Sequence, residues 1–278
     1  MKKSTAKFMT MFIKDKEKKD FVYEILTDKS RMIFYKNAVK DNSKKQPPAQ
    51  PMKTGYNIRG FNNKIIIIEN GMERDLRDGE KIDGLDIKVN GDNNLIRLEL
   101  PIKSKNSLIQ IGTDNTPNDD VVVDIGTTPR FWNVWIECTV GRKQQCKIGK
   151  YTTISGAGFA LNDEYASCIV GEDCKLSNSI RIFGSDGHTI IDKDTNECIN
   201  TPTSPVTIGD HCWIGEAVRI TKNARIGNHC IVGGGSVACK DYKEDNVIIA
   251  GNPAKIVRRN ITWDRKCNFH YKKSKQGV

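Results

Sequence analysis

Residues 208–237 read IGDHCWIGEAVRITKNARIGNHCIVGGGSV, and this stretch decides the fold. An aliphatic residue opens every sixth position, and a small or medium residue follows four positions later. The openers are Ile208, Ile214, Ile220, Ile226 and Val232, and the followers are Cys212, Val218, Ala224, Cys230 and Ser236. A period of six is neither the helical 3.6 nor the strand period of 2.0, so the pattern indicates a repeat architecture.

Such a repeat predicts short parallel strands, three to a coil of about eighteen residues, with the coils stacked into a solenoid. The aliphatic openers fill the interior, and the Gly that follows most of them lets the backbone turn. Cys212 and Cys230 lie one coil apart, so they should stack inside. His211 and His229 share that spacing on the outside, which we interpret as a consequence of the period rather than a metal site.

Composition divides the chain into four regions. Residues 1–54 read as a basic helical extension followed by a Pro-rich linker. Residues 55–128 contain β-rich runs separated by Asn, Asp and Gly, which we interpret as irregular coils capping the solenoid, with an independent β-sandwich as the alternative. Residues 129–262 form the main β-helix, in which Val134 and Val140 open an early six-residue register, and residues 263–278 are a basic tail.

The net charge of +10 belongs to the two ends of the chain. Residues 1–50 carry 13 Lys and Arg against 6 Asp and Glu, and residues 256–278 carry 7 against 1. Basic ends can attract an anionic membrane face or an acidic glycan, or they can be solvated tails. Nucleic acid is not expected as a partner, because no aromatic residues are interleaved with the charge.

Cysteine usage and hydropathy indicate the compartment. The nine cysteines include no Cys-x-x-Cys, and Cys174, Cys212 and Cys230 fall in the small interior slot, so buried reduced thiols are expected and a zinc site is not. The sequence shows neither a transmembrane span nor a signal peptide. We therefore expect a cytoplasmic protein, with peripheral contact at the inner face of the membrane as an option.

The repeat is interrupted between Ile182 and Ile208 by a segment that contains Ser185-Asp186-Gly187-His188. Insertions in repeat proteins concentrate on the functional face. Imidazole titrates near neutral pH and can take a proton from an alcohol or an amine. His188 is therefore a candidate general base, although a lone histidine is more often structural.

Together, the hexads, the looped-out SDGHTIID, the rung CWIGEAVRI and the closing IIAGNPAKIVRR resemble the left-handed β-helix acetyltransferases. Within that superfamily the chain is most similar to the O-acetyltransferases of bacterial surface polysaccharides, including those that modify sialic acid. The resemblance covers residues 130–262. It implies a left-handed parallel β-helix, a homotrimer with active sites between subunits, acetyl-CoA as co-substrate and a sugar or glycan acceptor, plausibly sialylated.

The resemblance also implies roles for individual residues. His188 matches the general base, Trp213 matches a Trp near that histidine, and Asp186 or Asp192 is available to orient the imidazole. No metal is implied. The residues implied in binding acetyl-CoA are Gly215, Ala217, Gly233, Gly234, Gly235, Ser236, Lys240, Ala250, Lys255 and Arg258.

Three other functions stay open from the sequence. The chain could be an N-acetyltransferase acting on a nucleotide-amino-sugar, a non-catalytic β-helix used for assembly, or a zinc-dependent hydratase of the same fold. The last would need His188, His211 and His229 to converge, and their spacing does not favour that.

Overall fold

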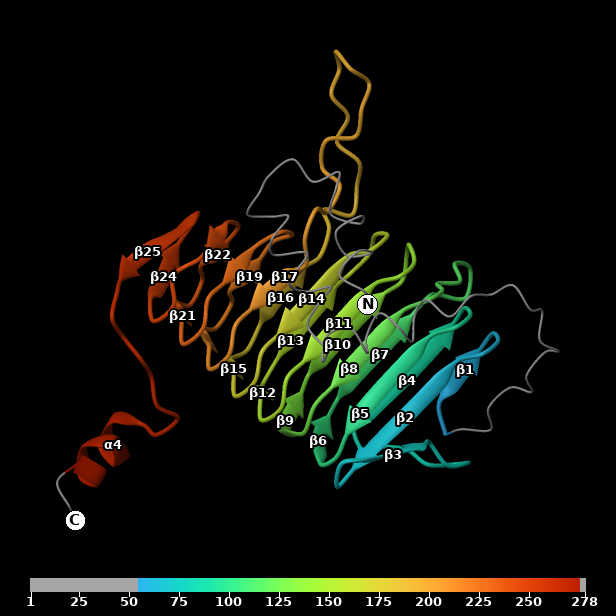
Figure 1. The fold of residues 1–278 in the computed structure, drawn as a ribbon, viewed down its shortest axis with the longest axis horizontal. Coiled ribbons are helices and arrows are strands. Elements are labelled where there is room, and N and C mark those ends of the chain that lie inside the picture. Colours follow the sequence, from blue (N-terminus) through green and yellow to red (C-terminus); the bar gives the residue numbers. More distant parts are fainter. Residues whose placement is uncertain (1–54, 276–278) are drawn as a thin grey trace, which may run out of the picture. The chain divides into compact units, whose positions relative to one another are not determined.

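The computed structural model describes residues 55–275, and nearly all regular structure in that range is parallel β-sheet. The chain passes in turn through three sheets, named A, B and C, and each pass through all three makes one coil (Figure 1). The helix expected within residues 1–54 and the linker after it lie outside the described residues.

Sheet A contains β1 (Asn57–Arg59), β4 (Leu85–Asn90), β7 (Ser107–Ile111), β10 (Val134–Cys138), β13 (Ala157–Ala160), β16 (Ile180–Phe183), β19 (Arg219–Ile220) and β22 (Val237–Ala238). Sheet B contains β2 (Lys64–Glu69), β3 (Met72–Asp75), β5 (Leu95–Glu99), β8 (Val122–Ile125), β11 (Gln145–Ile148), β14 (Ser167–Val170), β17 (Val206–Ile208), β20 (Arg225–Ile226) and β23 (Asp241–Tyr242). Sheet C contains β6 (Ile102–Lys105), β9 (Thr128–Trp132), β12 (Thr153–Ile154), β15 (Lys175–Leu176), β18 (Trp213–Ile214), β21 (Ile231–Val232), β24 (Ile248–Gly251) and β25 (Ala254–Arg258).

The predicted left-handed parallel β-helix is confirmed. All five aliphatic openers and all five followers of residues 208–237 are buried, with at most 2 % of each exposed. The upper coils have the period of eighteen, as the pairing of Arg219 with Val237 shows. Cys174, Cys212 and Cys230 are buried free thiols, and the Cys212 amide donates to Cys174 Sγ across 3.4 Å.

The coils that come earlier in the chain are longer. Leu108 pairs with Trp135, and Val134 pairs with Ala157, so these coils exceed eighteen residues. Their strands are long enough to alternate between inside and outside, as the burial of Val134, Ile136 and Cys138 shows. Placing Val140 inside was therefore wrong, because this side chain follows the end of β10 and is 54 % exposed. The same three sheets continue down to β1, so residues 57–128 are coils of one solenoid with the residues that follow.

The last described segment runs back along the corner between sheets B and C. Ile261 exchanges hydrogen bonds with Asn246, and the Trp263 indole donates to the carbonyl of His211 at 2.7 Å. Arg265 then reaches Asp173, and the chain ends in α4 (Asn268–Lys275). The part called a basic tail from sequence thus packs on the solenoid through Trp263, which is 9 % exposed.

Most of the stability should come from the interior stack, which a matched pair of aromatic residues can test. Phe131 is fully buried, whereas Trp135 on β10 points outward and is 40 % exposed. We expect Phe131→Ala to lower the free energy of unfolding by about 3–5 kcal/mol, because it removes buried surface and leaves a cavity. Trp135→Ala should cost about 1 kcal/mol or less. Urea denaturation measures both, and equal losses would contradict the assignment of inside and outside.

Candidate active site

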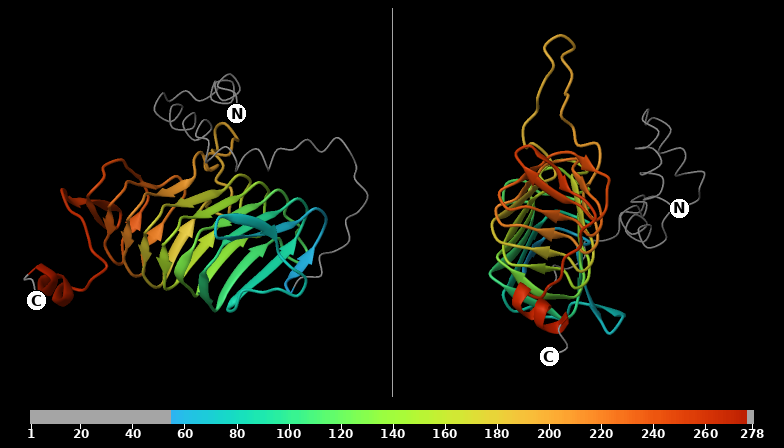
Figure 2. Two further views of the ribbon diagram at one scale, coloured as in Figure 1. Left: turned by 60° about the horizontal axis from the view of Figure 1, so that its bottom comes forward. Right: turned by 90° about the vertical axis from the view of Figure 1, so that its left-hand side faces the viewer.

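The interruption predicted from sequence is an arm formed by residues 184–205, which leaves the solenoid at the corner between sheets A and B (Figures 1 and 2). Ser185 anchors its start, because its hydroxyl donates to the carbonyl of Asn162 in the preceding coil at 3.0 Å and accepts from the Gly187 amide at 3.3 Å. Gly187 has φ +74°, a left-handed conformation that costs a glycine little. This turn places His188 at the foot of the arm.

Asp186 fastens the same foot to the next coil. Its carboxylate pairs with Lys222 at the following corner between sheets A and B, and it accepts a hydrogen bond from Asn200 Nδ2 at 2.9 Å. The hydrogen bond from Lys222 lowers the pKa of the Asp186 carboxyl below its usual value. The structure thus gives Asp186 two partners other than the His188 imidazole.

Asn200, on the returning strand of the arm, was not singled out from sequence. Its side-chain amide donates to the His188 carbonyl at 2.8 Å, and its side-chain oxygen accepts from the Ile190 amide at 2.8 Å. Asn200 therefore fixes the backbone that directly follows His188. Nothing in the surrounding Asn, Thr and Pro residues distinguishes it from an ordinary loop residue.

Beyond Asn200 the arm is a hairpin. The Ile199 amide donates to the carbonyl of Ile190, and Asp192 Oδ1 accepts from the amides of Asp194 and Thr195 at the tip. Asp192, the second candidate for orienting the imidazole, is thus used by the turn. The His188 imidazole is exposed, and within residues 55–275 it forms no side-chain hydrogen bond. Its two nitrogens are free to engage a ligand.

Most residues expected to bind acetyl-CoA gather at a different corner, between sheets C and A. Consecutive coils place Gly215 and Ala217, then residues 233–236, then Ala250 there. The corners contact one another, because the Gly235 amide donates to the Glu216 carbonyl at 2.8 Å and the Gly251 amide donates to Ser236 Oγ at 3.1 Å.

The glycines of this corner are needed for different physical reasons. A Cβ on Gly215 would lie 2.6 Å from the backbone nitrogen of Gly234, so close stacking of coils requires this glycine. Gly235 has φ +69°, which the turn requires. Gly234 is exposed, but a Cβ on it would lie 3.2 Å from the carbonyl oxygen of Glu216, so the stacked corner restricts this position as well. A Cβ on Gly235 would meet nothing within 4 Å, which makes the surface open beside Gly235.

The candidate cations are divided between two corners. Lys255 pairs with Ala250 in the hairpin of β24 and β25, next to the glycine corner, and Arg258 lies opposite Ile248 in the same hairpin. Lys240 instead follows β22 at the corner between sheets A and B, on the same side as His188. The structure thus separates Lys240 from the other candidates.

Trp213 is on the outer face of sheet C, which lies opposite the corner that carries His188. Its indole is 38 % exposed and donates to Ser177 Oγ at 3.4 Å, with the Lys175 ammonium 5.7 Å from the ring centroid. One chain therefore does not bring Trp213 and His188 together.

His211 and His229 stack on the outside as expected, with ring centroids 5.4 Å apart. His211 is a bridge in the fold, since its Nδ1 lies 2.7 Å from Asp173 and its Nε2 lies 3.1 Å from the carbonyl of Trp263. Across residues 55–275 no group of three His, Cys, Asp or Glu side chains could hold a metal ion. No helix in the same range is long and apolar enough to cross a membrane.

Comparison with known proteins gives the family. The bacterial transferase hexapeptide (six repeats) family matches residues 205–238. A polysialic acid O-acetyltransferase of Neisseria meningitidis is 31 % identical over 211 residues, which cover 76 % of this chain and 90 % of that protein. One of Escherichia coli O1:K1 / APEC is 36 % identical over 140 residues, which cover 46 % of this chain and 45 % of that protein, so the match spans less than half of the Escherichia coli relative.

A solved structure agrees on the fold. The crystal structure of the polySia specific acetyltransferase NeuO superposes with a TM-score of 0.52 at 20 % identity, over 81 % of this chain and 99 % of that one. Fold and sequence together define an acyltransferase built on a left-handed β-helix. The chain belongs to the family of hexapeptide-repeat acetyltransferases that includes the polysialic acid O-acetyltransferases.

The ion pair between Asp186 and Lys222 should hold the foot of the arm against the next coil. A depressed carboxyl pKa means that the pair stabilises the arm above the unfolded pKa of about 4 and that this stability is lost as pH falls through the folded pKa. Both side chains are partly exposed, so we expect Lys222→Met to cost about 0.2–1 kcal/mol of local stability. Amide exchange at Gly187 and Ile190 should then accelerate up to about fivefold at neutral pH. Lys193→Met, at the exposed tip, removes the same charge and should change nothing; equal acceleration in both variants would contradict the role of the pair.

Proposed function

We propose that the chain transfers the acetyl group of acetyl-CoA to a hydroxyl of a sialic acid residue in a bacterial cell-surface glycan. The relatives named above support the acceptor class, and the free imidazole of His188 at the foot of the arm supports the chemistry. That imidazole is the observation that carries the proposal, because a general base needs an accessible nitrogen without another partner.

His188 acts on the acceptor hydroxyl. One ring nitrogen takes the hydroxyl proton while the oxygen forms a bond to the thioester carbonyl carbon. The carbon–sulfur bond then breaks, and the imidazolium returns the proton to the departing thiolate. The products are an acetyl ester and the CoA thiol, with His188 regenerated, and no covalent bond to the enzyme forms. Asn200 and Asp186 contribute by fixing the backbone that carries the imidazole.

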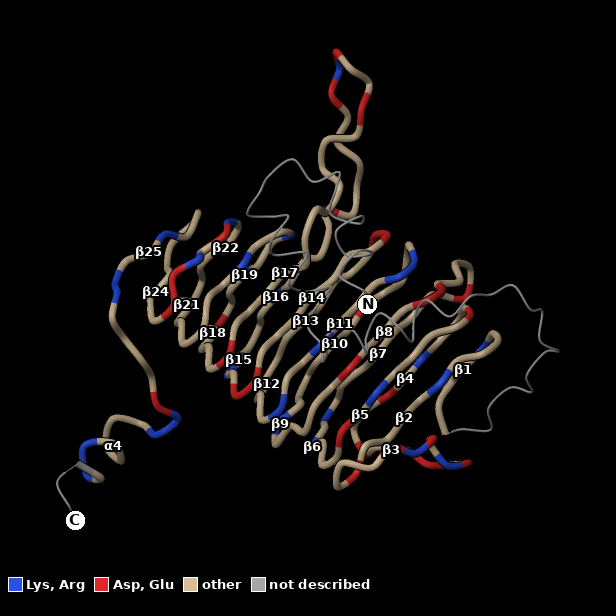
Figure 3. Tube along the Cα trace, in the orientation of Figure 1, with Lys and Arg blue, Asp and Glu red and all other residues tan. Residues whose placement is uncertain are grey.

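The proposed donor site is the glycine corner between sheets C and A. The open surface beside Gly235 allows a pantetheine chain to lie close to the backbone. Strand β25, whose Lys and Arg positions are marked in Figure 3, supplies the exposed cations Lys255 and Arg258 for the phosphates. An open backbone surface with two cations beside it fits an elongated, anionic molecule such as acetyl-CoA.

The active site is proposed to lie between subunits of a homotrimer. The His188 corner and the glycine corner are different corners of one solenoid, so a neighbouring chain must bring them together. The arm also exposes Ile190, Ile191 and Ile199, each more than half exposed, which a neighbouring subunit would cover.

His188→Ala should lower acetyl transfer about 10²–10⁴-fold and leave the affinity for acetyl-CoA within about threefold. His229→Asn is the matched control, since it removes an exposed histidine and its φ of +56° suits asparagine. Product mass gives the rate, and lability to mild base identifies an ester rather than an amide. Retained turnover in His188→Ala would exclude the base, and a base-stable product would indicate N-acetylation.

Complementation tests the shared site. His188→Ala and Gly234→Leu, whose side chain would crowd the glycine corner beside the Glu216 carbonyl, should each be inactive as homotrimers. When the two are co-expressed and assemble at random, about one quarter of the sites combine an intact His188 with an intact neighbouring glycine corner, so about a quarter of wild-type activity should return. A site built within one chain would show no recovery.

A further inference from the structure

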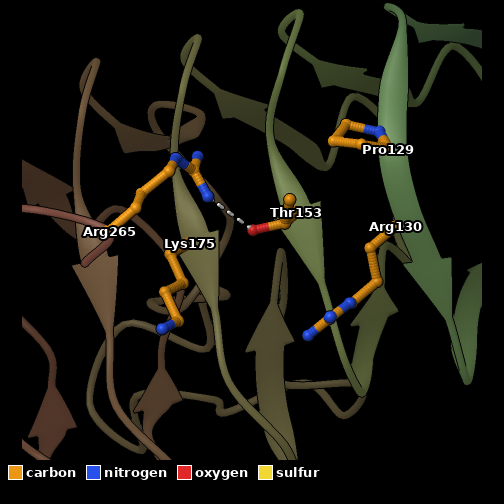
Figure 4. Close-up of a pocket in the computed structure, with 5 residues that line it drawn as sticks. All are labelled: Pro129, Arg130, Thr153, Lys175 and Arg265. Atoms are coloured by element: carbon orange, nitrogen blue, oxygen red, sulfur yellow. Dashed lines mark hydrogen bonds between the residues drawn. The ribbon is translucent and has the colours of Figure 1, made fainter. Parts of the chain in front are cut away.

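A furrow lies on the outer face of sheet C, and none of the residues that line it has been assigned a role so far. It has a volume of about 230 Å³ and is lined by Pro129, Arg130, Thr153, Lys175 and Arg265 (Figure 4). Strands β9, β12 and β15 contribute its floor, and the returning C-terminal segment contributes Arg265 as one wall.

Arg265 is part of the scaffold of the furrow. It donates to Thr153 Oγ1 at 3.0 Å and pairs with Asp173 at 2.8 Å, so its charge is already matched. It also donates to the carbonyls of Tyr151 and Cys174. This network fixes the position of Arg265. The net positive charge of the furrow therefore comes from Arg130 and Lys175.

Arg130 and Lys175 are the uncompensated cations. Neither forms an ion pair with a carboxylate within the described part of the chain. The Arg130 guanidinium lies 4.6 Å from the ring centroid of Trp132, and the Lys175 ammonium lies 5.7 Å from that of Trp213. Each cation is thus held against an indole that is itself 38 % exposed.

Aromatic rings beside unpaired cations match a particular ligand chemistry. Indole surface packs on the apolar face of a sugar ring, and guanidinium and ammonium groups bind carboxylates. The strands that carry the two indoles, β9 and β18, are three strand spacings apart, about 14 Å, which is wider than one sugar ring. The ligand that fits is therefore an oligomer of acidic sugars rather than a single sugar.

We propose that this furrow is a docking subsite for a carboxylate-bearing glycan, in which Arg130 and Lys175 bind carboxylates and Trp132 and Trp213 pack against sugar faces. The inference rests on the proposed function and deepens it, since it assigns acceptor recognition to sheet C. A bound polymer would extend past Trp213 toward the glycine corner on the same sheet, where a neighbouring His188 would meet it.

Charge distinguishes this furrow from a larger hollow of about 450 Å³ on sheet A. There Arg59 pairs with Asp114 at 2.7 Å, and Lys88 lies 3.9 Å from Asp86. Its cations are matched by carboxylates, so it offers no net attraction to an anionic polymer. Arg59 and Lys88 therefore supply a control pair.

The test measures binding without turnover, in full-length His188→Ala protein and without acetyl-CoA. Arg130→Gln with Lys175→Gln should raise the Kd for a polymer of sialic acid about tenfold, and Arg59→Gln with Lys88→Gln should leave it unchanged. The same polymer with its carboxylates reduced to alcohols should bind weakly, and equally to the His188→Ala parent, the furrow variant and the control variant. In the background with intact His188, the furrow variant should raise the KM for the polymer about tenfold with kcat and the KM for acetyl-CoA unchanged.

Three results with the variant Arg130→Gln, Lys175→Gln would overturn the inference. The first is an unchanged Kd for the polymer, and the second is an equal loss of affinity for DNA or dextran sulfate. The third is a change of its oligomeric state, measured by light scattering, which would make the furrow a subunit interface. Trp132→Ala, which keeps both cations, should weaken polymer binding as well. If it has no effect on the Kd, a sugar ring does not pack on Trp132. Because the Kd measurements need no acetyl transfer, failure of the docking subsite is distinguishable from failure of the proposed reaction.

Discussion

The structure depends on the hydrogen-bonded ladder between consecutive coils. Each strand pairs with the strand one coil above it, as Trp213 with Ile231 and Ile214 with Val232, so neighbouring coils are held about 4.8 Å apart. Every interior side chain then lies directly above its counterpart, and every corner must turn in the space left by the corner below. The aliphatic column, the small residues beside it and Gly215 against Gly234 all follow from this spacing.

A ladder of this kind leaves little freedom within a coil, so variation is confined to corners and outer faces. At the corner between sheets A and B the chain extends into the arm, and its position is set by contacts with the coils on both sides: Ser185 with the preceding coil, and Asp186 with Lys222 in the next. Asn223 adds to this anchoring, because its side-chain oxygen accepts from the amides of Thr203 and Ser204. The arm is thus a long insertion with a fixed base, which is what a histidine needs if it is to meet a substrate at a defined angle.

The sequence revealed the parts of this arrangement that repeat, and it missed those that depend on contacts between distant residues. Residues 208–237 have a strict period because their strands are two or three residues long, so the β-helix and its buried positions could be predicted. Earlier coils have longer strands with an alternating pattern, which is why Val140 was misplaced. His188 stood out because it interrupts the repeat. Asn200 could not be found, because its role comes from folding back on His188 across a hairpin, and the furrow cations could not be found either, because Arg130 and Lys175 are neighbours only through β12.

The distribution of features over the three sides favours a site completed by assembly. Sheet C carries Trp213 and the furrow, the corner between sheets C and A carries the exposed Gly234, and the corner between sheets A and B carries His188 and Lys240. A single solenoid therefore presents the proposed donor and acceptor surfaces next to one another but holds the base on the opposite side. In the proposed homotrimer the corner between sheets A and B of one chain would face the corner between sheets C and A of the next, which would bring the base and the donor surface together. In that proposed trimer the arm would lie against the neighbouring chain, which would cover the exposed Ile190, Ile191 and Ile199.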